Sequence, residues 1–305
     1  MENKIYDIII VGAGPAGMTA ALYAKRSNKT VLILEKEAIG GQISLAPKVE
    51  NFPTIKSITG AELSDMMFEQ VMDMGVEFEL EKVEQIEKVN NEFIVTTDYN
   101  THKARSVIIA TGAKHKMIGL KNEEDFLGKG LSYCATCDGS FFKGEDVAVI
   151  GDGNSALQYA LQLSDICQKV YVCTLFDKFF GDSVLVERLH QKSNITVIPN
   201  ISLVDIKGSE NIDELVFENM LDKSIFTLPV KGCFIAIGQN PDNDIIKNLV
   251  EINKAGYAVV DETTTTKTPG LFVAGDCRTK QVRQATTAVS DGAVAAMQAV
   301  GYLNQ

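Results

Sequence analysis

Two cysteines, Cys134 and Cys137, are separated by two residues, and Asp138 follows directly. This spacing can close a small disulfide ring, and the adjacent carboxyl group can donate or accept a proton. A dithiol that cycles between open and closed forms needs both features, because the thiolate is the reactive form and a proton must be moved. The pattern therefore favours a redox-active cysteine pair.

Two other interpretations of this pair are half of a zinc site and two buried small side chains. A zinc site takes about four ligands, but the three histidines are scattered. The other cysteines stand alone in the sequence: Cys167, Cys173, Cys233 and Cys277. This ligand count predicts no metal site, and the redox interpretation leads.

A dinucleotide-binding pattern lies near the start of the chain. An apolar strand at 6–11 is followed by Gly-Ala-Gly-Pro-Ala-Gly at 12–17, a helical pattern to 26 and a second strand at 30–34 that ends at Glu35. In this order Gly12 permits a tight turn, Gly14 lets the backbone approach a pyrophosphate, and Gly17 lets the helix pack against the strand. The N–H groups at the helix N-terminus favour phosphate, and Glu35 can accept hydrogen bonds from a ribose. A purely structural glycine turn is the alternative, but the full context favours a dinucleotide.

The same unit recurs roughly 140 residues later, which indicates an internal repeat. A strand at 146–150 leads into Gly151-Asp152-Gly153, a helix to 163 and a strand at 169–175. The sequence therefore predicts an α/β protein with two Rossmann-like, three-layer ββα dinucleotide-binding domains. The first domain is expected to be discontinuous, at 1–114 and 243–305, and the second to occupy 115–242 with the cysteine pair.

Further elements follow from the apolar patterns. A helix at 60–74 carries Leu63, Met66, Met67 and Met74 at near-helical spacing, which predicts a core-facing stripe. Short strands at 83–86, 93–97 and 106–109 predict an inserted antiparallel sheet. A last strand lies within 270–276, and an alanine-rich helix runs from about 284 to 300. His115 is interpreted as a surface residue rather than a base.

Composition narrows the classes of partner. A chain of 305 residues suits two domains. The net charge of −11 argues against nucleic acid and against an anionic membrane surface. No apolar run reaches the roughly 18 residues of a membrane span. The N-terminal residues lack the pattern of a signal peptide, and the cysteines do not form a secreted framework. We therefore expect a cytoplasmic protein with neither nucleic-acid nor membrane partners.

Over essentially its whole length the chain resembles the low-molecular-weight thioredoxin reductases, which are FAD-containing homodimers with a Cys-Ala-Thr-Cys motif. The matching motifs are GAGPAG at 12–17, GGQ at 40–42, ENFP at 50–53, ATG at 110–112, CATCDG at 134–139, AGD at 274–276 and RQA at 283–285. The resemblance implies an FAD-dependent enzyme that reduces thioredoxin or a thioredoxin-like protein.

The resemblance also implies the roles of individual residues. Cys134 and Cys137 would form the redox disulfide, with Cys137 facing the flavin, and Asp138 would assist proton transfer. Asp276 would lie on the ribitol chain, and the N-terminus of the helix after Gln284 would stabilise negative charge on the reduced flavin. The residues expected to bind FAD are Gly12, Gly14, Pro15, Ala16, Gly17, Glu35, Lys36, Gly41, Gln42, Asn51, Val83, Ala110, Thr111, Gly112, Gly275, Asp276, Arg283, Gln284 and Ala285.

The second repeat departs from the family. There the strand matching 170–175 is followed by a His-Arg-Arg-x-x-x-Arg run that binds the 2′-phosphate of NADPH, but residues 173–181 read CTLFDKFFG and contain no arginine. Losing two charged hydrogen bonds costs roughly 3–6 kcal/mol, on the order of 10² to 10⁴ in affinity. Asp152 adds a negative charge to the phosphate turn. The sequence thus resembles a pyridine-nucleotide-independent branch that takes electrons from ferredoxin.

Three functions remain open from the sequence. The first is a disulfide reductase that passes electrons from ferredoxin through FAD to Cys134 and Cys137. The second is an ordinary NADPH- or NADH-dependent thioredoxin reductase. The third is a non-catalytic flavin-binding redox sensor, which the intact cysteine pair and Asp138 disfavour because a mere binder needs neither.

Overall fold

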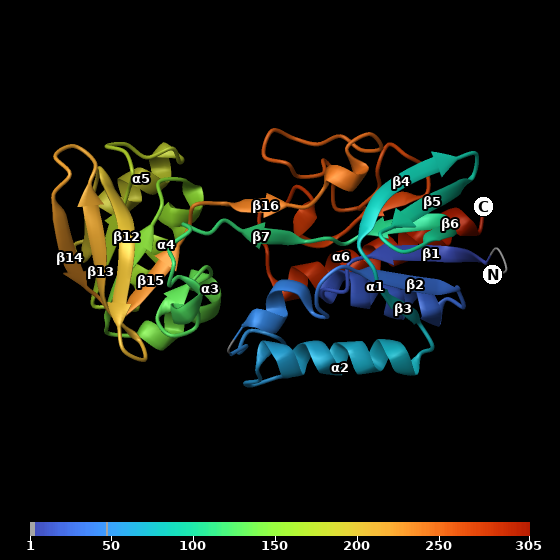
Figure 1. The fold of residues 1–305 in the computed structure, drawn as a ribbon, viewed down its shortest axis with the longest axis horizontal. Coiled ribbons are helices and arrows are strands. Elements are labelled where there is room, and N and C mark those ends of the chain that lie inside the picture. The colour runs from blue at the N-terminus through green and yellow to red at the C-terminus, as the bar shows by residue number, and fades with distance from the viewer. Residues whose placement is uncertain (1–3, 47) are drawn as a thin grey trace. The chain divides into compact units, whose positions relative to one another are not determined.

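The computed structural model describes residues 4–46 and 48–305, and the chain folds into two compact units (Figure 1). The first unit holds the chain up to Lys114 and again from Asn240, and the second holds His115–Gln239. The chain passes from the second unit back to the first between residues 239 and 240, whereas the sequence places this boundary between residues 242 and 243. The reason is local, because β16 (Gln239–Pro241) pairs with β7 (Ala113–His115) in a two-stranded ribbon.

The first unit is organised around a mainly parallel sheet with the strand order β3-β2-β1-β6-β5-β4, and β17 also pairs with β6. Its strands are β1 (Ile5–Val11), β2 (Val31–Glu35), β3 (Glu77–Leu80), β4 (Val83–Val89), β5 (Glu92–Thr97), β6 (Thr101–Ile109) and β17 (Leu271–Val273). β6 runs parallel to β1 and antiparallel to β5. It therefore joins the expected antiparallel insertion to the central sheet.

Both faces of this sheet are covered, which explains why β1 is a continuous apolar run. Ile8 and Ile10 face one core with the helices, and Ile9 and Val11 face another that includes residues of β4 and β5. The helical elements are α1 (Pro15–Arg26), η1 (Gly41–Leu45), α2 (Gly60–Asp73), η4 (Asp244–Ile246), η5 (Gly275–Cys277) and α6 (Ala285–Leu303).

The α2 helix starts with a capping box, in which Thr59 and Glu62 satisfy each other's backbone N–H groups. Leu63 is buried and Met67 packs against the core, as expected. Met66 is 55% exposed, so the predicted core stripe is wrong at this position. The core-facing residues Leu63, Met67 and Val71 repeat every four residues, and position 66 lies beside that face.

The second unit contains a parallel sheet between two different layers. Its strand order is β11-β10-β9-β15-β8, with a separate antiparallel sheet β12-β13-β14. The strands are β8 (Leu131–Ser132), β9 (Asp146–Ile150), β10 (Lys169–Cys173), β11 (Ile195–Ile198), β12 (Ile201–Gly208), β13 (Ile212–Asn219), β14 (Ile225–Pro229) and β15 (Gly232–Ile235). The helical elements are η2 (Glu124–Phe126), α3 (Ala135–Asp138), η3 (Gly139–Phe142), α4 (Asn154–Ser164) and α5 (Ser183–His190).

One core of the second unit joins the parallel strands to the antiparallel sheet, and another joins them to α4 and α5 (Figure 1). The three layers are thus antiparallel sheet, parallel sheet and helices. The internal repeat is real, because β9-α4-β10 has the same order and parallel pairing as β1-α1-β2. The predicted α/β class with Rossmann-like units is confirmed. Among the described residues, no helix has both the length and the apolar character to span a bilayer.

The α1 and α6 helices approach each other closely because their contact is lined by small residues. A Cβ atom on Gly292 of α6 would overlap the carbonyl oxygen of Ala16 and lie 3.1 Å from the amide nitrogen of Ala20. Both obstacles are backbone atoms, which cannot rotate away. The position therefore requires glycine for packing.

Gly292→Ala should destabilise the protein by about 1–3 kcal/mol, since overpacking forces α1 and α6 apart. Gly301→Ala is the matched control in the same helix, because its Cβ would meet nothing within 4 Å. That control should gain up to about 1 kcal/mol from helix propensity. Urea denaturation measures both, and equal stability of the two variants would contradict the close packing.

Candidate functional site

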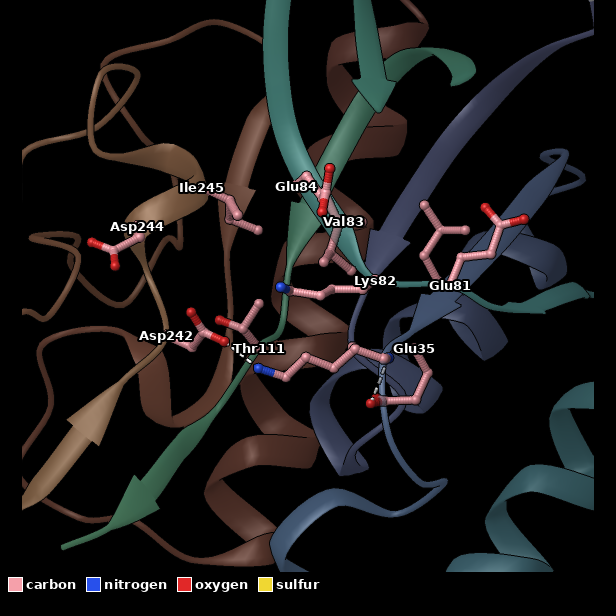
Figure 2. A pocket seen from close by; sticks show the side chains of 13 residues that line it. Glu35, Glu81, Lys82, Val83, Glu84, Thr111, Asp242, Asp244 and Ile245 are labelled. Atoms are coloured by element: carbon pink, nitrogen blue, oxygen red, sulfur yellow. Dashed lines mark hydrogen bonds and ion pairs between the residues drawn. The ribbon is translucent and has the colours of Figure 1, made fainter. Parts of the chain in front are cut away.

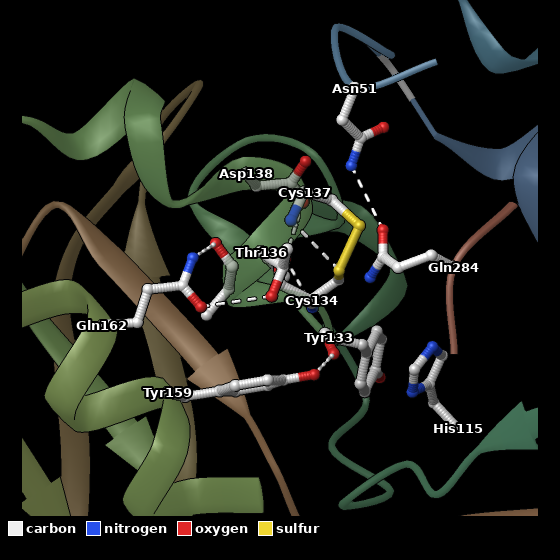
Figure 3. Close-up of a disulfide and its surroundings, with 12 residues drawn as sticks. Asn51, His115, Tyr133, Cys134, Thr136, Cys137, Asp138, Tyr159, Gln162 and Gln284 are labelled. Carbon is white, nitrogen blue, oxygen red and sulfur yellow. Dashed lines mark hydrogen bonds between the residues drawn. A yellow bond between two sulfur atoms is a disulfide. The ribbon is translucent and has the colours of Figure 1, made fainter. Parts of the chain in front are cut away.

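The predicted redox pair is closed in the structure as a disulfide between Cys134 and Cys137, with their Cα atoms 5.3 Å apart (Figure 3). Cys134 is the extended residue that caps α3, and Cys137 lies within that single helical turn. Residues three apart lie on the same side of a helical turn, which brings the sulfurs together. The Cys137 N–H group points at the Cys134 sulfur, 3.1 Å away. This donor favours negative charge on Cys134 when the pair is reduced.

Asp138 lies beside the disulfide in an environment that favours its protonated form. Burial raises the pKa of this carboxyl group, although a hydrogen bond from Ser132 opposes the effect. The Ser132 hydroxyl donates to Oδ2 at 2.6 Å, and Oδ1 is buried without a partner among the described residues. Asp138 is therefore suited to carry a proton to or from a sulfur of the pair.

Ser132 also accepts a hydrogen bond from the Cys134 N–H group at 3.0 Å. A single hydroxyl thus orients both the acid and the backbone of the first cysteine. Ser132 could not be predicted from the sequence, because a lone serine two positions before a cysteine carries no signal of its own. The short β8 strand, which pairs with β15, fixes its position.

Tyr133 anchors the residue before the disulfide. Its hydroxyl donates to the buried Glu123 carboxylate at 2.6 Å, and Glu123 also accepts backbone N–H groups from residues 118–120. The His115 ring stacks on Tyr133 with 5.2 Å between ring centroids (Figure 3). His115 is half-buried, and burial lowers its pKa. Its interpretation as a surface residue is therefore wrong, because β7 turns its ring onto Tyr133.

The other cysteines are buried thiols: Cys167, Cys173, Cys233 and Cys277. Burial raises the pKa of Cys167 and that of Cys277 to about 11, and it also raises the pKa values of Cys173 and Cys233. Thiols of this kind are inert at neutral pH. Within residues 4–46 and 48–305, no three His, Cys, Asp or Glu side chains gather as they would around a metal ion.

The glycine turn of the first unit has the geometry that a dinucleotide requires. Gly12 has φ +110°, and a Cβ there would overlap the carbonyl oxygen of Ala110. The turn is open at Gly14, where an added Cβ would meet only the Gly40 oxygen, 3.9 Å away. Pro15 begins α1, as is favoured at the first helical position. The N-terminus of α1 is thus approachable by a phosphate group.

A cavity of about 310 Å³ lies beside this turn (Figure 2). The residues expected from the sequence that line it are Gly12, Glu35, Lys36, Val83 and Thr111, and the unexpected ones include Glu81, Lys82, Glu84, Asp242, Asp244 and Ile245. Glu35 accepts the Ala13 N–H group at 2.7 Å, and Lys36 forms an ion pair with Asp242. The unexpected residues come from β4, from the two residues before it and from the returning chain, which local motifs do not connect to the turn.

The remaining predicted FAD residues do not line this cavity. They lie at the start of α1, on η1 and in the loop after it, after β6, on η5 and at the start of α6: Gly14, Pro15, Ala16, Gly17, Gly41, Gln42, Asn51, Ala110, Gly112, Gly275, Asp276, Arg283, Gln284 and Ala285. Several still meet within the first unit. Gly41 lies against Gly14, and Asn51 donates to the Gln284 side chain at 3.2 Å.

Asp276 offers an acceptor that the protein leaves unused. Its Oδ1 is buried and has no hydrogen-bond partner among the described residues, and burial raises its pKa. Nearby, the Nε atom of Arg283 is also buried without a partner, and its guanidinium lies 4.3 Å from the centre of the Tyr257 ring. Unpaired buried polar atoms are costly unless a ligand satisfies them. A polyhydroxyl chain joined to a pyrophosphate fits this donor and acceptor set, so the residues present suit FAD.

Comparison with known proteins gives the family. The model of the pyridine nucleotide-disulphide oxidoreductases matches residues 6–292. The chain belongs to this family. It is 38% identical over 305 residues to thioredoxin reductase of Listeria monocytogenes, covering 100% of this chain and 96% of that protein. The family, the disulfide and the orphaned acceptor agree, and we conclude that this oxidoreductase is an FAD-binding enzyme of the thioredoxin reductase type.

Two solved structures show the range of similarity. Thioredoxin reductase from Streptococcus pyogenes has a TM-score of 0.95 and 37% identity, with 99% of each chain covered. A ferredoxin-flavin thioredoxin reductase from Clostridium acetobutylicum has a TM-score of 0.54 and 30% identity, with 98% of each chain covered. The comparisons therefore support the family predicted from the sequence but not its narrower assignment to the ferredoxin-linked branch.

Cys134→Ser or Cys137→Ser should abolish disulfide reduction and leave bound FAD in place, because the residues that fit FAD lie in the first unit. The assay is reduction of a small aromatic disulfide by protein that has been pre-reduced with dithionite, with flavin absorbance recorded in parallel. Cys167→Ala is the control and should retain activity. An essential Cys167 would contradict the assignment of a single redox pair.

Asp138→Asn tests the proton-carrying carboxyl. Because burial raises the Asp138 pKa, the wild-type acid keeps its proton above the usual range and loses it as pH rises through that pKa. We expect the wild-type rate of disulfide reduction to fall on this alkaline limb. The variant should lose the limb and react about 10² to 10⁴ times more slowly. Stopped-flow rates from pH 5 to 9 measure this, with the exposed Asp165→Asn as control, and an unchanged limb in Asp138→Asn would exclude the role.

Proposed function

We propose that this enzyme reduces the disulfide of thioredoxin or a thioredoxin-like protein through Cys134 and Cys137. The observation that carries the proposal is the disulfide at the start of α3 with the buried, partly unpartnered Asp138 carboxyl beside it. Similarity to the thioredoxin reductases of Listeria monocytogenes and Streptococcus pyogenes supports thioredoxin as the substrate. A homodimer and a cytoplasmic location stay predictions from the sequence.

The proposed chemistry is two thiol–disulfide exchanges. The thiolate of one cysteine attacks a substrate sulfur, which forms a mixed disulfide and releases the other substrate sulfur as a thiolate. The second cysteine attacks the mixed disulfide, which restores the Cys134–Cys137 bond and frees the reduced substrate. FAD, when bound and reduced, would supply the two electrons that reopen this bond, and Asp138 holds the proton that the departing sulfur takes up.

The electron donor is a separate part of the proposal, and the second unit bears on it. Its glycine turn repeats that of the first unit: a Cβ on Gly151 would lie 2.5 Å from the Ala236 carbonyl oxygen, and a Cβ on Gly153 would meet nothing within 4 Å. The turn then leads into α4, whose N-terminus would be the phosphate site. The chain itself lies against this N-terminus: Phe180 N–H donates to the Asp152 oxygen, and Asp182 N–H donates to Asn154 Oδ1, both at 2.7 Å.

Gly181 lies between these two hydrogen bonds. A Cβ on Gly181 would be 2.6 Å from Asn154 Oδ1 and 3.2 Å from the Asn154 amide nitrogen. Residues 180–182 thus approach the first turn of α4 at backbone distance. A phosphate that reached the Asn154 amide would have to displace them, at the cost of both hydrogen bonds.

The surface after β10 is apolar, whereas the family has arginines there that bind the 2′-phosphate of NADPH. Phe176 and Phe180 are exposed and meet edge to face at 5.5 Å. Lys178 lies over the Phe180 ring. The only arginine between 115 and 239 is Arg188, on α5, where it lines a shallow hollow with the C-terminal half of α4. No guanidinium fork is therefore available for a 2′-phosphate at this turn.

We therefore propose that NADPH is a poor donor and that a low-potential carrier such as ferredoxin reduces the flavin. Two reduced one-electron carriers balance one disulfide. Similarity to the ferredoxin-flavin thioredoxin reductase of Clostridium acetobutylicum supports such a donor. The other relatives, which are called simply thioredoxin reductases, leave an NADPH- or NADH-dependent enzyme as the alternative. A sensor without turnover is a further one.

Stopped-flow reduction of the bound flavin tests the donor. NADPH at micromolar concentration should bleach it slowly and without saturation, whereas reduced ferredoxin should bleach it rapidly and then allow thioredoxin to be reduced. Rapid saturable bleaching by NADPH would return the protein to the NADPH-dependent class. Failure of thioredoxin to reoxidise the reduced protein would instead favour the sensor.

Arginine substitutions add a second test of the same surface. Thr174 is buried and its hydroxyl donates to the Phe176 oxygen at 2.7 Å, so the exposed Leu175 and Phe176 are the suitable positions. Leu175→Arg with Phe176→Arg should improve NADPH use only in part, since residues 180–182 still cover the turn. Full recovery in this double variant would show that the missing cations alone exclude NADPH.

A further inference from the structure

A cluster of buried charges lies where the chain passes from η5 to α6. The side chains of Arg278, Lys280 and Asp291 are only 2%, 5% and 7% exposed. Burying ionised groups is costly unless each is paired and hydrogen-bonded. No sequence motif accounts for the cluster, although it lies beside Asp276.

Asp291 is the centre of the cluster. Its Oδ2 accepts the Gly275 N–H group at 2.9 Å, Arg278 Nε at 2.8 Å and Lys280 Nζ at 3.0 Å, and its Oδ1 accepts Arg278 Nη2 at 2.8 Å. Burial works to raise the Asp291 pKa, but these cationic donors outweigh burial and lower it. Asp291 is therefore ionised, and it ties the η5 turn to α6.

The fork of Arg278 contacts both carboxylate oxygens of Asp291, and its Nη2 also pairs with the exposed Glu262 at 3.1 Å. Lys280 is then a second buried cation on the same carboxylate. Its nearest other anion is Asp276, with 3.9 Å between Nζ and Oδ1. This Oδ1 is the atom that is buried without a hydrogen-bond partner. The charge of Lys280 thus also faces a buried carboxylate oxygen that the protein leaves without a hydrogen bond.

We propose that Lys280 is a positioning residue for the flavin: it opposes the effect of burial on Asp276, the expected acceptor for FAD, and adds a positive charge that favours the reduced cofactor. The inference rests on the proposed place of Asp276 in the FAD site. Reduced flavin carries negative charge, so a buried cation nearby raises its midpoint potential. A purely structural lysine would change stability and leave this potential unaltered.

Lys280→Gln tests this, because glutamine keeps a hydrogen-bond donor toward Asp291 and removes the charge. Titration of the apoprotein with FAD should show about tenfold weaker binding. Spectroelectrochemistry of the holoprotein should show a midpoint potential about 30 mV more negative, which is a tenfold change for two electrons. Lys280→Arg should stay near wild type in both, as should Lys267→Gln, a control at an exposed lysine. An unchanged affinity and potential in Lys280→Gln would overturn the proposal.

Asp276→Asn separates this inference from the placement of FAD. Weaker FAD binding in Asp276→Asn with no effect of Lys280→Gln would refute only the role of Lys280. Unchanged binding in Asp276→Asn would refute the placement itself.

If the Lys280→Gln protein does not fold, the double variant Lys280→Gln with Asp276→Asn is used instead. It also removes the negative charge of Asp276, which Lys280 no longer compensates. The proposal expects the double variant to fold, because the Arg278–Asp291 pair is intact. If neither variant folds, the cluster serves folding alone and the proposal is wrong.

Discussion

Close backbone contact at the end of a parallel strand is the constraint on which both units depend. In the first unit a Cβ on Gly17 would overlap the Gly12 carbonyl oxygen, so α1 can begin only where glycine allows it. That contact places the N-terminus of α1 beside the open Gly14 turn and the cavity. In the second unit Gly151 makes the same kind of contact with the Ala236 oxygen, but residues 180–182 hydrogen-bond to Asp152 and Asn154 at the N-terminus of α4. One geometry thus supports both turns, and only the second has another chain segment against its helix N-terminus.

The turn that carries the Cys134–Cys137 disulfide depends on different interactions, because its function is proton and sulfur chemistry rather than phosphate binding. Its parts are held by local hydrogen bonds: Ser132 orients Asp138, and Glu123 holds Tyr133 directly before Cys134. Glu123 is buried and fully used by four donors, so it is a rigid anchor. The disulfide therefore sits on a fixed support, while the free oxygen of Asp138 stays available for a proton.

Much of the fold could be predicted from the sequence, because parallel strands buried on both faces are continuous apolar runs and glycine turns mark where they end. The cysteine pair was equally visible, since spacing alone brings the two sulfurs together. The predicted burial of Met66 and the predicted exposure of His115 were wrong, because neighbouring elements decide burial at the edge of a helix or ribbon. Ser132, Glu123 and Asp291 were missed for a related reason. Each acts through hydrogen bonds to residues whose proximity only the folded chain creates.

Unpaired buried carboxylate oxygens on Asp138 and Asp276 meet the same electrostatic problem with different neighbours. Burial raises the pKa of both. Near Asp138 no cation forms an ion pair among the described residues, so the carboxyl tends to keep its proton and suits acid–base work. Near Asp276 the cations Lys280, Arg283 and Arg278 oppose the effect of burial, so its free oxygen is better suited to accept hydrogen bonds. The presence or absence of neighbouring cations therefore distinguishes the carboxyl group beside the disulfide from the one in the expected FAD site.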